Sequence, residues 1–194
     1  DPSKSRGLGD VYKRQGYILL GATTESAEGL YAMLFYLIVY CLMNMGAFFI
    51  AGKVEENNGG ERLSHFRGLG RTRPFYGICM AVFLFSLVGL PPFAGFIGKL
   101  YLFSAVLSRE MYGLAILAAV NSVISLYYYA KILRAMYLEE PVGDAPVAKK
   151  VNTFDSSFSY TFLTLLALPN LILGLYWEPV LNFAKAALEL FGGS

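Results

Sequence analysis

The chain has 194 residues, of which 56% are hydrophobic and 15% are charged. A soluble domain carries about 25% charged residues, so this composition excludes an ordinary soluble fold. The formal net charge is +2, and the basic residues lie in polar segments between apolar blocks. That distribution gives no case for nucleic-acid binding.

Residues 1–15, DPSKSRGLGDVYKRQ, are polar and basic and show no helical apolar face. The apolar sequence that follows starts abruptly at Gly16, like the last turns of a spanning helix whose beginning is missing. We therefore expect residues 1–15 to be a non-native leader joined to a fragment of a longer protein, with a natural polar tail as the alternative. We expect no signal peptide, because this segment lacks a central apolar region and a cleavage site.

Four long blocks contain no charged residue, namely residues 29–52, 74–98, 111–130 and 156–177. About 20 apolar residues in a helix cross a hydrocarbon core of roughly 30 Å. A helix satisfies its own backbone hydrogen bonds in lipid, so these blocks predict an all-α, polytopic membrane protein. We expect a transmembrane domain of about five to six spans over residues 16–177.

The C-terminal segment, residues 178–194, follows Tyr176 and Trp177 at the end of the last block. We expect these two aromatic side chains to lie in an interfacial belt. Residues 179–191 alternate apolar and polar side chains at helical spacing, which predicts a short amphipathic helix at the membrane surface.

The segment 74–107 is too long for one ordinary crossing, at about 51 Å as a straight helix, and short for two. Prolines and glycines break or loosen it at Gly89, Pro91, Pro92, Gly95 and Gly98. Two arrangements remain open: two short spans that meet at the prolines, or one crossing with an unwound middle. One broken crossing would place the basic loops 53–73 and 131–150 on the same side of the membrane, which the positive-inside rule favours.

Lys99 is the main candidate functional residue, because it carries a charge at membrane depth inside this broken segment. Such a charge costs about 2.5–3.5 kcal/mol on insertion scales, so it usually faces a polar interior. Burial disfavours the charged form of an amine, so a buried lysine can exchange a proton. A break beside it leaves room for water, as in transporters. The alternative is that Lys99 snorkels to the interface.

Further polar side chains lie on the next span. Asn121, Ser125 and Tyr129 follow one another at i, i+4 and i+8 and share one helix face, which makes them a candidate polar path. Hydrogen bonding between helices is the alternative for each. Lys131 stands at a helix end, where we expect an interfacial residue or a terminal relay.

The sequence offers no metal or covalent chemistry. Cys41 and Cys79 lie in apolar blocks and are interpreted as small buried hydrophobes, and His65 is a lone histidine in a polar loop. No nucleophile–base pair or glycine-rich phosphate loop is present. We therefore expect no cofactor and no metal in this chain.

Four strings carry a specific resemblance: FYLIVYCLMNMGAFFI (35–50), LSHFRGLGRTRP (63–74), SLVGLPPFAGFIGKLYLFSAV (86–106) and NSVISLYYYAKILRAMY (121–137). They resemble the subunit N (subunit 2) family of the proton-pumping NADH:quinone oxidoreductase, or complex I, which is related to Mrp-type antiporter subunits. The resemblance runs over about residues 16–185 and covers the C-terminal half of that subunit. The string GLPPFAGFIGK is its most specific part.

The resemblance implies an antiporter-like helix bundle that translocates protons in the membrane arm of a bacterial inner-membrane complex. NADH, FMN, iron–sulfur clusters and quinone would be handled by other subunits, and the partners would be an adjacent antiporter-like subunit, small membrane subunits and lipid. Lys99 would lie on a discontinuous helix within a chain of buried ionisable groups, so this chain would hold one half-channel. The alternatives are an Mrp-type cation/proton antiporter subunit and a non-conducting structural subunit.

Overall fold

The computed structural model describes residues 16, 20–24, 26–58, 62–140 and 157–190. The expected leader, residues 1–15, lies outside this part of the chain. Within it all regular elements are helices, which confirms the predicted all-α fold. They are α2 (Ala27–Asn58), the 3₁₀-helix η1 (Leu63–Phe66), α3 (Leu69–Thr72), α4 (Pro74–Val88), α5 (Ala94–Ser108), α6 (Tyr112–Leu138), α7 (Ser157–Leu175) and α8 (Glu178–Leu190).

The helices α2, α6 and α7 are each long and apolar enough to cross a membrane. Local sequence explains where two helices begin. At α2 the Ser26 hydroxyl accepts a hydrogen bond of 3.1 Å from the Gly29 N–H, and Glu28 places a negative charge in the first turn. At α4 the first helical residue is Pro74, whose missing N–H costs nothing at that position.

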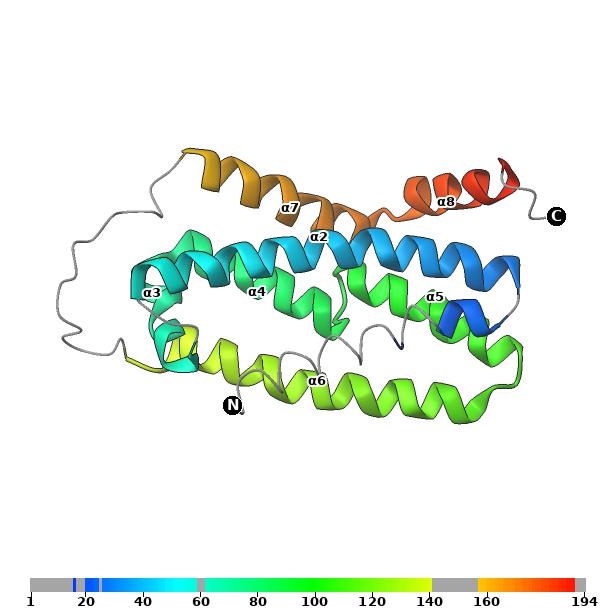
Figure 1. Cartoon of the computed structure of the whole chain (residues 1–194), viewed down its shortest axis with the longest axis horizontal. Coiled ribbons are helices and arrows are strands. Elements are labelled where there is room, and N and C mark those ends of the chain that lie inside the picture. Colours follow the sequence, from blue (N-terminus) through cyan, green and yellow to red (C-terminus); the bar gives the residue numbers. More distant parts are fainter. Residues whose placement is uncertain (1–15, 17–19, 25, 59–61, 141–156, 191–194) are drawn as a thin grey trace.

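The bundle is built around the pair α4 and α5, which lie end to end along its long axis (Figure 1). On one side both helices pack against α2, which in turn packs against α7 and α8. On the other side both pack against α6. Long helices therefore lie on two sides of the junction between α4 and α5.

This arrangement supports one broken crossing over residues 74–108. The helices α4 and α5 have 15 residues each, or about 22 Å, which is less than the hydrocarbon thickness of roughly 30 Å. Each therefore spans only part of the membrane, and together they run beside the full length of α2 (Figure 1). How many spans the whole segment 16–177 makes stays a prediction.

The polar segment between α2 and α4 meets the end of α6. The Gly68 N–H donates to the Ala135 carbonyl at 3.1 Å, and the Arg71 Nε donates to the Tyr137 carbonyl at 3.1 Å. The Arg67 Nε lies 2.7 Å from a carboxylate oxygen of Glu139. The two basic segments thus lie at the same end of the bundle, as the arrangement with one broken crossing requires.

The predicted C-terminal amphipathic helix is present as α8, and its interfacial placement stays a prediction. It follows α7 along α2, with Leu181 and Ala184 buried (Figure 1). The Lys185 ammonium lies 5.2 Å from the centre of the Tyr31 ring of α2. The apolar face of α8 therefore packs on protein. The boundaries of the three expected parts, 1–15, 16–177 and 178–194, stay predictions.

Large apolar side chains cover the outside of the bundle, as expected for a surface that faces lipid or other membrane helices. Phe48 and Ile116 are 68% and 63% exposed.

Cys79 is buried as predicted, whereas Cys41 is exposed on the outer face of α2, so the prediction of burial was wrong for that residue. Helical periodicity places it there, because Cys41 does not share the face that carries Val39 and Met43 into the core.

Candidate functional site

The C-terminus of α4 ends at mid-bundle in a glycine cap. Gly89 adopts a left-handed conformation with φ of +84°, and its N–H donates to the carbonyls of Phe85 and Ser86 at 3.0 Å each. Four carbonyls at a helix C-terminus lack partners within the helix. This turn therefore leaves the carbonyls of Leu87 and Val88 to be satisfied from elsewhere.

Lys99 provides hydrogen bonds to both of these carbonyl groups. From the second turn of α5 its side chain reaches back over the break, and Nζ donates to the Leu87 and Val88 carbonyls at 3.0 and 2.8 Å. The ammonium thus sits at the negative end of the α4 helix dipole, where a cation is stabilised. Lys99 is 7% exposed, so the side chain turns into the break and does not snorkel toward the helix end.

Contacts with α2 show where the break lies along the length of the bundle. A Cβ on Gly98 would lie 2.9 Å from Cδ2 of Tyr36, and a Cβ on Gly46 would overlap the ring of Phe83. The break between α4 and α5 therefore faces α2 between Tyr36 and Gly46. This is the middle of the uncharged block 29–52, so Lys99 lies at mid-depth of the bundle.

The α6 residue next to the ammonium is Ser122. Its Oγ lies 3.5 Å from Lys99 Nζ, at the limit of a hydrogen bond. Ser125 Oγ donates to the carbonyl of Asn121 within the same helix at 2.9 Å, and Tyr129 is buried. The candidate path through Asn121, Ser125 and Tyr129 stays a prediction.

Ser122 was not part of the path predicted from the sequence. The signal was available, because Ser122, Ser125 and Tyr129 share a face at i, i+3 and i+7. Lys131 is exposed, and its ammonium lies 4.3 Å from the centre of the Tyr127 ring. It lies inside α6, which continues to Leu138, and not at the helix end as expected. Its role as a relay stays a prediction.

The predicted break residues have distinct positions. The peptide bond between Pro91 and Pro92 is cis, and both residues are exposed. A Cβ on Gly95 would overlap the Ser86 carbonyl, and the Gly95 N–H donates to Ser86 Oγ at 3.0 Å. Gly95, like Gly98, therefore allows a close approach of helices beside the break.

A second polar group lies on the α7 side of the break. The Ser86 hydroxyl donates to Oδ1 of Asn170 at 2.6 Å, and both residues are fully buried. The Nδ2 group of Asn170 has no hydrogen-bond partner among the described residues. A buried donor without a partner costs about 1–3 kcal/mol. Sequence reasoning did not single out Asn170, although an amide inside an apolar helix, directly after Pro169, was a usable signal.

Two further residues of α7 and its C-terminal junction contact the broken helix. A Cβ on Gly174 would overlap the Pro92 carbonyl oxygen, so only glycine permits this approach. The indole N–H of Trp177 donates to the hydroxyl of Tyr101 on α5 at 3.0 Å. Trp177 therefore packs against α5, and its position in an interfacial aromatic belt stays a prediction.

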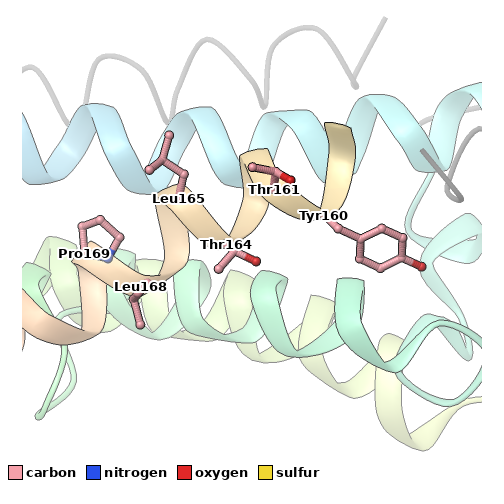
Figure 2. A pocket seen from close by; sticks show the side chains of 6 residues that line it. All are labelled: Tyr160, Thr161, Thr164, Leu165, Leu168 and Pro169. Carbon is pink, nitrogen blue, oxygen red and sulfur yellow. The ribbon is translucent and has the colours of Figure 1, made fainter. Parts of the chain in front are cut away.

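An open groove of about 450 Å³ lies elsewhere, on the outer face of α7 (Figure 2). Its lining comes from α7 alone and is mostly apolar: Tyr160, Thr161, Thr164, Leu165, Leu168 and Pro169. Leu165 and Leu168 are 67% and 52% exposed. The groove shares no residue with the surroundings of Lys99 and holds no charged side chain.

His65 lies in η1, where its Nδ1 accepts the Arg62 N–H at 3.2 Å. Among the described residues no group of histidine, cysteine and carboxylate side chains is placed to hold a metal ion. The chemistry of the site therefore rests on one amine, backbone carbonyls and hydroxyl groups. Such a set can exchange a proton, and it contains no nucleophile–base pair.

Residues 13–125 match the family model described as NADH:quinone oxidoreductase/Mrp antiporter, TM. The chain belongs to this family. Among solved structures, the chain superposes on a chain of respiratory complex I from Thermus thermophilus with bound Aureothin. The TM-score is 0.66 and the identity 27%, over 86% of this chain and 36% of that one. A chain of the Mrp complex from Dietzia sp. superposes with a TM-score of 0.77 and 25% identity, over 92% of this chain and 41% of that one.

The curated relatives carry a more specific name. NADH-quinone oxidoreductase subunit N 2 of Sorangium cellulosum is 44% identical over 179 residues, which is 90% of this chain and 34% of that protein. Subunit N of Anaeromyxobacter sp. is 38% identical over 186 residues, which is 92% of this chain and 35% of that protein. The resemblance to subunit N is confirmed, and the chain spans about a third of the length of these relatives.

Proposed function

We propose that this protein translocates protons in the membrane arm of an NADH:quinone oxidoreductase and that Lys99 accepts and releases the proton. The observation that carries the proposal is the position of Lys99, buried at mid-bundle in the break between α4 and α5. A lysine held there is a group that can change its charge inside the membrane. The names of the curated relatives support the choice of complex.

The surroundings of Nζ suggest a direction for the proton. An ammonium has three N–H donors, and two of them meet the carbonyls of Leu87 and Val88. A backbone carbonyl accepts a hydrogen bond but does not pass a proton onward. The Ser122 hydroxyl both donates and accepts, so the proton would enter or leave on the α6 side. Ser125 and Tyr129, on the same face of α6, would extend this route.

The rest of the assembly follows from the same proposal. The partners would be an adjacent antiporter-like subunit and small membrane subunits, in the inner membrane of a bacterium. This chain would carry no redox cofactor, and NADH oxidation and quinone reduction would take place in other subunits. It would therefore be part of an enzyme as a translocase subunit. An Mrp-type antiporter subunit is the alternative, supported by the superposition on the Dietzia sp. complex.

Two substitutions in the full-length subunit within its complex test the role of Lys99. Lys99→Ala removes the amine, and Lys99→Arg keeps a positive charge that cannot be released, because arginine stays protonated. We expect both variants to assemble and to pump fewer protons per quinone reduced in membrane vesicles. Lys185→Arg is the control, because that lysine is exposed on α8 and has no place in the proposed path. Unchanged pumping in an assembled Lys99→Arg complex would overturn the proposal.

A further inference from the structure

One face of α7 and its junction with α8 contacts every part of the broken helix. Asn170 and Gly174 follow at i and i+4 on α7 and share this face, and Trp177 lies in the junction that follows. Asn170 accepts a hydrogen bond from Ser86 at the end of α4. Gly174 lies against the carbonyl of Pro92 in the linker, and Trp177 donates to Tyr101 on α5.

Ser86 connects this face to Lys99. It precedes Leu87 and Val88, whose carbonyls hold the ammonium, and its Oγ accepts the N–H of Gly95, one helical turn before Lys99. The end of α4 and the start of α5 are thus joined twice, by Lys99 on the α6 side and by Ser86 on the α7 side. A shift of Ser86 would move the two carbonyls relative to Nζ.

The Ser86–Asn170 pair is a poor choice of side chains if its role is only to stabilise the fold. Both side chains are fully buried, and Nδ2 of Asn170 has no partner among the described residues. Replacing two such groups by apolar side chains of similar shape is close to neutral in other proteins, whereas a half-satisfied polar pair is costly. The hydrogen bond from the Gly95 N–H accounts for the Ser86 hydroxyl, but stability does not explain why a buried amide faces it.

We propose that Asn170 is a positioning residue for proton transfer at Lys99, acting through Ser86. Its carboxamide fixes the Ser86 hydroxyl, and Ser86 sets the distance between the end of α4 and the turn of α5 that carries Lys99. This inference rests on the proposed function, because it needs Lys99 to carry the proton. It assigns a role in proton transfer to α7, a helix that contains no charged residue.

The test uses the full-length subunit in its assembled complex, with Ser86→Ala, Asn170→Leu and the double variant. We expect the protons pumped per quinone reduced to fall several-fold, because misplacing a reacting group by about 1 Å costs up to roughly 10²-fold in rate. We expect the double variant to melt only slightly below the native complex, because it removes the unpaired amide but also the acceptor of the Gly95 N–H. Ser159→Ala is the matched control, a serine of α7 that is also 1% exposed or less and lies away from the break.

The outcomes separate the two proposals. Normal pumping in assembled Ser86→Ala and Asn170→Leu complexes, beside a defect in Lys99→Ala, would overturn the positioning role alone. A loss of assembled complex with an unchanged ratio of protons to quinone in what remains would also overturn it, since that is what a purely structural pair does. Normal pumping in Lys99→Ala would overturn the proposed function and this inference with it.

Discussion

The ammonium of Lys99 donates a hydrogen bond of 2.8 Å to the carbonyl oxygen of Val88, the last residue of α4. The donor belongs to α5 and the acceptor to α4, so one side chain closes the gap between two half-helices. It also places the charge where the dipole of α4 stabilises a cation.

Gly89→Ala tests the glycine turn at the end of α4. Alanine at φ of +84° costs about 1–2 kcal/mol, and its Cβ would lie 2.9 Å from Cδ of Lys99. We expect the purified complex to unfold at a lower temperature and Lys99 to be displaced. Gly52→Ala is the control, because a Cβ there meets nothing within 4 Å and alanine in a helix is about 0.5–1 kcal/mol better than glycine. Equal melting temperatures for the two variants would contradict the prediction.

Ser122→Ala tests the route on the α6 side. Losing one hydrogen bond costs about 1 kcal/mol, which is roughly fivefold in a rate, so we expect proton pumping to slow by about that factor. Ser125→Ala is the comparison, because its hydroxyl donates to the Asn121 carbonyl of its own helix. We expect a smaller effect there. A slower Ser125→Ala than Ser122→Ala would show that the proton does not pass Ser122 first.

Tyr101→Phe removes the acceptor of the Trp177 indole N–H while keeping the ring that packs edge-on against Phe35. We expect a loss of about 1 kcal/mol in stability, because one partly buried hydrogen bond is lost. Thermal unfolding of the purified complex measures it. Tyr176→Phe serves as the control, since that side chain is 60% exposed beside Trp177. A larger loss in the control would place the stabilising contact elsewhere.

Glu139→Gln breaks the ion pair with Arg67, which is 2.7 Å long and half exposed. Exposed pairs contribute about 0.2–1 kcal/mol and are screened by salt. We therefore expect a small drop in melting temperature at low ionic strength and almost none at high ionic strength. The Gly68 N–H bond to Ala135 keeps the two segments together in the variant. A drop that persists at high salt would contradict this account.

The break itself could be predicted from local sequence. Pro91 and Pro92 lack the N–H that a continuous helix needs, and Gly89 provides the turn. Whether the two halves cross the membrane once or twice could not be predicted. That depends on which helices pack against them, and α2 and α6 favour a single crossing by running beside both.

The hydrogen-bond partners of Lys99 could not be predicted from the sequence either. Leu87 and Val88 contribute backbone carbonyls, which leave no trace in residue type, and Ser122 stands next to the equally plausible Asn121. The face of α7 was missed for another reason. Asn170, Gly174 and Trp177 become a set only when that face is known to lie on the break.

By itself the sequence determined that this protein is an all-α membrane bundle with a broken helix and one charge at mid-depth. It could do so because lipid requires long apolar helices and makes a lone lysine stand out. Only the tertiary structure decided where that charge goes. The Lys99 ammonium donates to the last carbonyls of α4, a helix to which Lys99 does not belong, and lies 3.5 Å from the Ser122 hydroxyl of α6. Long-range packing fixes such contacts, and no local pattern encodes them.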